Sequence, residues 1–451
     1  MALSALTAIA QDTDEGGVLL TFGIEQRFEV GRNIALEVPE EGTSSVATTT
    51  LSFGLSSETR TQRISIEGSS GLRIANLPGE GTDVGFGDTE LRLEYGQDVG
   101  NSAFTANAEY NHRDIDFLRS LSDFEDDDGV IVLPPDFDDL TGGGTRREYD
   151  VELGLELGRE SVLGFNLRAG ASGVDYSGTT DPDLFQTRTT NLGLDTILRF
   201  SEVTTGIIGL SAEQYDADNA EMTDRLTTAI TFGVEHEISP RARVDASVGY
   251  SVIDTEELIS GDTRTTGVIW HLGLDYDMPN GVLTADLDST RDVAGRLQTF
   301  RLGRSIEIPD GTLSGSIGVA DLPGGNTEII GDLSWRQELG PNEIIAEISR
   351  AVSTSSDDES RATTTAGIGY IWGLSPLSSV RFNVAYALTD GTATEAEVER
   401  TDVSAIYRRA LTPDWNLNTG VIYRTRDEEG VGRAESPSVF VSVDRQFSIR
   451  P

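Results

Sequence analysis

The chain has 451 residues, a formal net charge of −42 and no cysteine. The missing cysteine excludes disulfides, thiolate metal sites and cysteine nucleophiles. The excess of acidic residues argues against nucleic acid as a partner, because phosphate binding needs clustered Lys and Arg. Hydrophobic residues make up only 37% of the chain, and 49 residues are glycine. This composition suits strands with one apolar and one polar face better than a close-packed interior.

The N-terminal segment resembles the end of a secretory signal peptide. Residues 1–10 end in Ala8-Ile9-Ala10, which fits the small-x-small cleavage pattern. We interpret residues 1–10 as a signal-peptide remnant, with an ordinary disordered terminus as the alternative. No linker or composition break divides residues 11–451, so we expect them to form a single domain.

Side-chain polarity alternates with a period of two residues along almost the whole chain. Segment 149–157 places Tyr, Val and Leu on one face and Asp, Glu and Gly on the other, and segment 268–276 repeats the pattern. Such alternation indicates half-buried strands. We count 22 of these segments, the first at 17–29 and the last at 437–450.

The connections between the segments alternate between short and long. The short ones, such as 239–241, 309–311 and 340–342, contain Pro or Gly, which favour tight turns. The long ones are rich in acidic residues and comprise 31–44, 75–83, 116–144, 254–262, 353–360, 389–397 and 427–435. Short periplasmic turns and longer external loops are typical of outer-membrane barrels, whose sheet must close to pair every backbone group. The sequence therefore predicts an all-β fold, a closed antiparallel transmembrane β-barrel of about 22 strands.

Aromatic side chains cluster near the ends of the predicted strands, as expected for girdles at lipid-headgroup level. The predicted girdle residues are Tyr95, Tyr110, Tyr149, Tyr176, Tyr215, Tyr250, Tyr276, Tyr370, Tyr386, Tyr407, Tyr423, Trp335, Trp372 and Trp415.

The C-terminal segment resembles the terminal strand of Gram-negative outer-membrane barrels. One face of this segment carries Val439, Val441, Val443, Phe447 and Ile449. The segment departs from the usual pattern, which ends in an aromatic residue, because Arg450 and Pro451 follow. Over the whole chain the architecture is similar to porin-like barrels of alphaproteobacteria. This resemblance implies an outer-membrane location and contact with outer-membrane lipid.

TonB-dependent transporters resemble the chain in strand number but carry a plug domain before the barrel. The first predicted strand begins near Gly17, so we expect no separate plug domain. The wide lumen would then be filled by loops, a partner, inward side chains or water.

Segment 116–144 is the longest predicted loop. It combines acidic runs with the apolar run 130–133, which a purely solvated loop would not need. The hypothesis is a constriction loop folded into the pore, whose carboxylates form a cation-selective ring. The ring candidates are Asp126, Asp127, Asp128, Asp136, Asp138 and Asp139. The alternative is an external flap.

Charged residues on the polar face of the strands are expected to line the lumen. They are Glu90, Arg92, Glu94, Glu152, Glu156, Asp195, Arg199, Arg243, Asp245, Asp332 and Arg336. Charges of opposite sign on neighbouring strands would set a transverse electric field across the pore. The simpler interpretation is that these charged residues only keep the interior hydrated.

No catalytic pattern is present. The three histidines lie far apart without metal-ligand spacing, and no G-x-S-x-G elbow occurs, so we predict no enzyme, no metal and no cofactor. The predicted function is a porin-like channel for passive diffusion of small hydrophilic solutes, with a preference for cations. The alternatives are an export or secretion outlet, for example for polysaccharide, with periplasmic or envelope protein partners, and a structural barrel with an occluded lumen.

Overall fold

A computed structural model of the protein describes residues 17–40, 42–78, 81–117, 120–124, 131–134, 136–138, 140, 143–179, 181–323, 325–354, 359–392 and 395–450. The strands are β1 (Gly17–Arg32), β2 (Thr43–Glu58), β3 (Gln62–Leu77), β4 (Gly81–Val99), β5 (Ser102–Asp114), β6 (Thr145–Leu157), β7 (Leu163–Ser177), β8 (Thr187–Ser201), β9 (Thr204–Ala217), β10 (Thr223–Ser239), β11 (Ala242–Glu256), β12 (Thr263–Met278), β13 (Gly281–Arg291), β14 (Arg296–Ile308), β15 (Gly311–Asp321), β16 (Thr327–Leu339), β17 (Asn342–Thr354), β18 (Ser360–Ser375), β19 (Ser378–Thr389), β20 (Val398–Ala410), β21 (Trp415–Glu428) and β22 (Gly432–Ile449). Two short 3₁₀ helices, η2 (Ile115–Phe117) and η3 (Leu121–Phe124), lie between β5 and β6.

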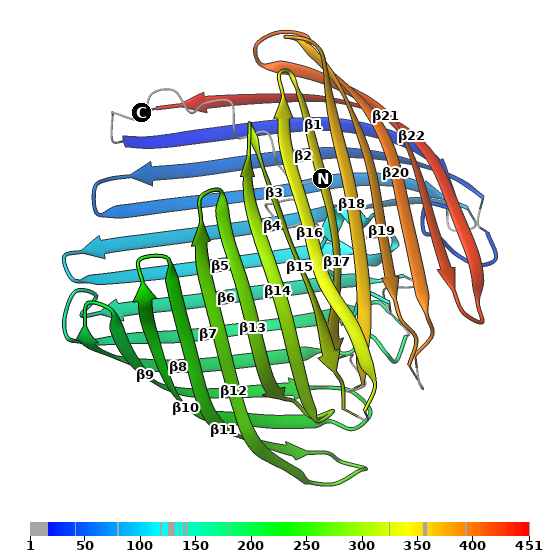
Figure 1. Cartoon of the computed structure of the whole chain (residues 1–451). Coiled ribbons are helices and arrows are strands. Elements are labelled where there is room, and N and C mark those ends of the chain that lie inside the picture. The colour runs from blue at the N-terminus through cyan, green and yellow to red at the C-terminus, as the bar shows by residue number, and fades with distance from the viewer. Residues whose placement is uncertain are drawn as a thin grey trace.

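The strands form one closed antiparallel barrel (Figure 1). Each strand pairs with its neighbours in sequence, and β1 closes the sheet by pairing with β22 from Leu20 opposite Ile449 to Gly31 opposite Ser438. Closure joins the first strand to the last, as a membrane-spanning sheet requires. The predicted 22-strand closed barrel is therefore confirmed.

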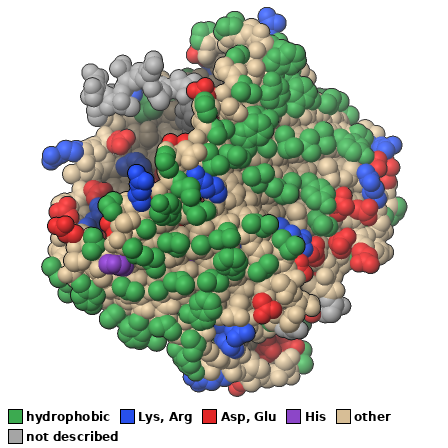
Figure 2. Space-filling model, viewed as in Figure 1, with side chains coloured by type: hydrophobic (Ala, Val, Ile, Leu, Met, Phe, Trp, Pro, Cys, Tyr) green, Lys and Arg blue, Asp and Glu red, His purple; other side chains and the backbone are tan. Residues whose placement is uncertain are grey.

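The two faces of the barrel wall differ in polarity. Phe22, Ile24 and Phe28 of β1 are exposed on the outer face, and Figure 2 shows apolar side chains over much of the visible surface. Arg27 points to the opposite, inner face, where its guanidinium lies 3.8 Å from the ring centre of the buried Phe440. The period-two alternation of the sequence thus produces an apolar exterior and a polar interior.

The connections differ between the two ends of the barrel. At the periplasmic end they are tight turns, and Gly100 and Gly340 occupy the left-handed region there with φ of 57° and 67°. Gly adopts this conformation without the steric cost that a Cβ would add. At the external end the connections are longer on the whole, the longest being 115–144. Within the described residues, no helix is long and apolar enough to cross a bilayer.

Two external connections are shorter than the sequence predicts. The pairing of β3 with β4 continues to Leu77 opposite Gly81. The pairing of β21 with β22 continues to Glu428 opposite Gly432. The predicted loops 75–83 and 427–435 therefore shrink to 78–80 and 429–431, because their polar residues extend the strands instead. The predicted signal-peptide remnant, residues 1–10, lies outside the described residues.

Candidate transport lumen and its internal loop

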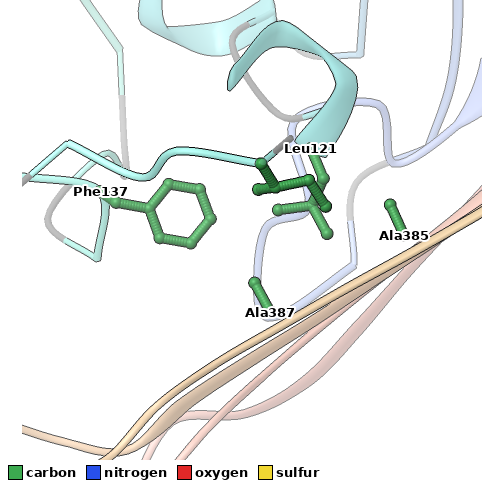
Figure 3. Packing of buried hydrophobic residues seen from close by; sticks show 5 residues of the cluster. Leu121, Phe137, Ala385 and Ala387 are labelled. Carbon is green, nitrogen blue, oxygen red and sulfur yellow. The ribbon is translucent and has the colours of Figure 1, made fainter. Parts of the chain in front are cut away.

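The connection between β5 and β6 is called the internal loop (residues 115–144), and its described residues pack against the inside of the barrel. Leu121, Ile131 and Phe137 of this loop form a buried cluster with Ala385 and Ala387 of β19. Figure 3 shows Leu121 and Phe137 close to these two alanines. Because β19 is far from β5 in the order of paired strands, the internal loop crosses the lumen to reach the opposite wall.

Backbone groups of the internal loop bind carboxylates on that opposite wall. Asp402 of β20 accepts hydrogen bonds from the Leu121 N–H at 2.7 Å and from the Ser120 hydroxyl at 3.1 Å. Glu347 accepts the Ile131 N–H at 3.1 Å and lies near the middle of β17. The internal loop therefore reaches well below the external rim.

Arginines on the same wall hold the second half of the internal loop. The Arg361 guanidinium forms an ion pair with Asp138 at 2.9 Å. Arg400 donates to the Phe137 carbonyl at 3.1 Å and stacks 4.0 Å from the centre of the Phe137 ring. Arg426 donates to the Asp138 carbonyl at 3.2 Å. All three arginine side chains are buried. Burial raises the pKa of the Asp138 carboxyl, and the charges of Arg361 and Arg400 oppose this shift.

The wall next to β5 anchors the two ends of the internal loop. Arg146 of β6 forms an ion pair with Asp136 at 2.8 Å, and the Tyr176 hydroxyl donates to the same carboxylate. Near the start of the loop, the Arg73 guanidinium lies 3.7 Å from the ring centre of Phe117. The described residues of the internal loop are thus held at both walls.

The structure changes the role expected for the ring carboxylates. Asp136 and Asp138 bind Arg146 and Arg361, and their side chains are only 18% and 9% exposed. They do not face the open lumen as free carboxylates, so that part of the predicted ring is wrong. The other candidates, Asp126, Asp127, Asp128 and Asp139, lie outside the described residues.

The predicted lumen charges all lie on the inner face, because they alternate with exposed apolar residues on their strands. These residues are Glu90, Arg92, Glu94, Glu152, Glu156, Asp195, Arg199, Arg243, Asp245, Asp332 and Arg336. Arg199 differs in role, since it donates to the turn carbonyls of Gly158 and Ser161 at 3.1 and 2.9 Å. It therefore stabilises a periplasmic turn.

The inner face of β4, β5 and β6 is predominantly acidic. Its carboxylates are Glu90, Glu94, Glu109, Glu148, Asp150, Glu152 and Glu156. Arg92 lies among them, 3.6 Å from Glu109. Away from Arg146, which binds the internal loop, this wall faces the lumen, whereas the basic wall of β18, β20 and β21 is covered by the internal loop.

One inner-wall cluster was not predicted from the sequence. His271 of β12 bridges Asp245 of β11 and Asp288 of β13, with its Nε2 and Nδ1 each 2.6 Å from a carboxylate oxygen. The sequence could have indicated this cluster, because all three residues fall on the polar face of adjacent strands. Within the described part of the chain, no group of His, Asp and Glu side chains has the arrangement of a metal site.

Two predicted girdle residues face inward. Tyr176 contacts Asp136, and Tyr215 lies beneath Arg225, whose guanidinium is 5.3 Å from the ring centre. The prediction used position along the strand, but the phase of the alternation puts these rings on the inner face. The other predicted girdle residues lie on the apolar outer face: Tyr95, Tyr110, Tyr149, Tyr250, Tyr276, Tyr370, Tyr386, Tyr407, Tyr423, Trp335, Trp372 and Trp415.

Solved structures of outer-membrane iron transporters and receptors share this fold. The FrpB iron transporter from Neisseria meningitidis (F3-3 variant) aligns with a TM-score of 0.60 and 11% identity, covering 96% of this chain and 82% of that chain. The ferric-catecholate import receptor Fiu from E. coli K12 aligns with a TM-score of 0.58 and 8% identity, covering 96% and 82%. The siderophore receptor PirA from Pseudomonas aeruginosa aligns with a TM-score of 0.51 and 9% identity, covering 95% and 80%. No protein-family model and no curated protein matches the chain.

The fold and the apolar exterior together define a β-barrel of the Gram-negative outer membrane, with the strand number of TonB-dependent receptor barrels. The described residues contain no plug domain separate from the barrel. Its fold is that of these solved iron transporter and receptor barrels.

Proposed function

We propose that the protein is a passive channel for small hydrophilic solutes and that it prefers cations. The observation that carries this proposal is the position of the internal loop. It covers Arg361, Arg400 and Arg426 on one wall and leaves the acidic wall of β4 to β6 facing the lumen. Fixed negative charge along an aqueous path attracts cations and repels anions.

The cation preference then arises from the strands of the barrel wall and not from a ring of carboxylates on the internal loop, which the sequence predicted. Asp136 and Asp138 neutralise arginines and so remove positive charge from the passage. Carboxylates such as Glu94, Asp150 and Glu152 on the strands supply the net negative field.

The fold similarity suggests a second cargo, a ferric chelate, because FrpB and Fiu are named for iron and ferric-catecholate transport. An acidic lumen wall opposes entry of a polyanionic ferric catecholate. We therefore favour small cationic or neutral solutes.

Planar-bilayer recording of the refolded barrel tests the proposal. A steady current, with a reversal potential in a KCl gradient that indicates cation preference, is expected. A barrel that inserts but carries no current would support the occluded structural barrel, and anion preference would overturn the assignment of the acidic wall. Current that appears only with envelope proteins added would support an export outlet.

A further inference from the structure

In the described part of the chain, the external end of β4 is paired with a strand on one side only. β4 pairs with β3 along its length, up to Gly81 opposite Leu77. Its pairing with β5 begins only at Thr89 opposite His112. β5 ends two residues later, at Asp114, where the chain enters the internal loop. Among the described residues, no strand pairs with the second side of residues 81–87, which we call the β4 edge.

The β4 edge carries exposed apolar side chains. Val84 is 62% exposed and Phe86 is 78% exposed. In register beside them on β3 lie Ile74 and Leu72, also exposed. An open backbone edge does not occur in the hydrocarbon of a bilayer, because its N–H and C=O groups would lack partners. The β4 edge therefore lies beyond the membrane on the external side.

We propose that the β4 edge binds an extended cationic peptide by strand addition. Unpaired backbone donors and acceptors of a strand are satisfied by a further strand. Alternate apolar side chains of the peptide would pack beside Val84 and Phe86. Basic residues between them would complement Asp83 and the chain's net charge of −42.

A second copy of the chain does not fit this edge. Barrel strands tilt by about 35–45° from the barrel axis. A two-fold axis along the membrane normal would relate β4 to a strand of opposite tilt, so the two edges would cross instead of pairing. Lipid has no backbone amides to complete the ladder. An extended peptide is the occupant that satisfies both the hydrogen bonds and the apolar face.

A binding experiment tests the proposed strand addition. It measures how a fluorescent ten-residue peptide of alternating Val and Lys binds to the full-length refolded barrel in detergent. Saturable binding is expected, and it should be lost when every backbone amide of the peptide is N-methylated, because the ladder needs those donors. The double variant Val84→Asn, Phe86→Asn is expected to bind about tenfold more weakly.

The matched control is Ile74→Asn, which lies on the same outer face but on a strand already paired on both sides. It is expected to change binding little. Binding of the N-methylated peptide, or equal loss in Ile74→Asn and the double variant, would indicate adhesion to the apolar surface and overturn strand addition. Absence of binding to the wild-type barrel would also overturn it.

Discussion

The Asp138 carboxylate lies 2.9 Å from the Arg361 guanidinium, which joins the internal loop to the wall opposite the strands that carry it. Both side chains are largely buried, with exposed fractions of 9% for Asp138 and 6% for Arg361. Arg361 also pairs with Glu395, so removing the arginine would leave two buried carboxylates without this partner, which is costly. The contact therefore holds this part of the internal loop in one position.

Phe137→Ala is expected to release the internal loop while leaving the barrel folded. Removing a buried Phe ring costs about 3–5 kcal/mol of packing, and here the loss falls on the loop, where Phe137 packs against Arg400 and Leu121. The released loop should be cut by protease under conditions in which the wild-type loop resists, and single-channel conductance should rise. If the loop stays protected while the barrel is intact, the cluster is not what holds it.

Glu94→Gln with Glu152→Gln is expected to lower the cation-to-anion permeability ratio by about twofold, since each removed charge weakens the lumen potential. Reversal potentials in a KCl gradient measure this. The difference should shrink in high salt, where the screening length falls to about 3 Å at 1 M. Glu256→Gln, at the external end of β11 with its side chain exposed, is the control and should leave the ratio unchanged.

Leu210→Arg and Ser211→Arg are neighbouring changes on opposite faces of β9. Leu210 is 47% exposed on the apolar outer face, so an arginine there should destabilise the barrel in lipid by about 2–4 kcal/mol. Ser211 faces the lumen, and an arginine there should cost far less. Denaturant titration of the barrel in liposomes measures both. Equal losses would contradict the assignment of the two faces.

The closure of the barrel can be tested directly, because the chain has no cysteine of its own. Phe22 and Phe447 stack across β1 and β22 with ring centres 5.6 Å apart and lie opposite each other in register. Replacing both with Cys should give a disulfide on oxidation, since opposed Cα atoms lie within the about 4.4–6.8 Å that a disulfide spans. The pair Phe22→Cys, Val443→Cys is out of register and should stay reduced.

The strands were predictable because alternation is a local property of the sequence. Segments 17–29 and 437–450 correspond to β1 and β22, whose true bounds are Gly17–Arg32 and Gly432–Ile449. The apolar run of segment 116–144 indicated that part of it packs against the barrel, as its described residues Leu121, Ile131 and Phe137 do. The partners of Asp138 could not, because Arg361 and Arg426 are brought to it only when the barrel closes.

The errors in the predicted girdle have a different origin. Tyr176 and Tyr215 stand near strand ends, as girdle residues do, but one residue out of phase with the apolar face. A shift of one residue moves a side chain to the other face of a strand. Leu167 on β7 and Leu210 on β9 mark the outer face of their strands. Counting alternate residues from them places Tyr176 and Tyr215 on the inner face.

The pairing of β1 with β22 also constrains how the protein reaches its membrane. During synthesis the first strand emerges long before its final neighbour, and until then both sides of the growing sheet are open. Such a sheet cannot enter hydrocarbon, and in water its exposed edges favour aggregation. Delivery must therefore rely on holding factors that keep the finished polypeptide extended, and a chain clipped ahead of β22 should accumulate in the periplasm as a protease substrate.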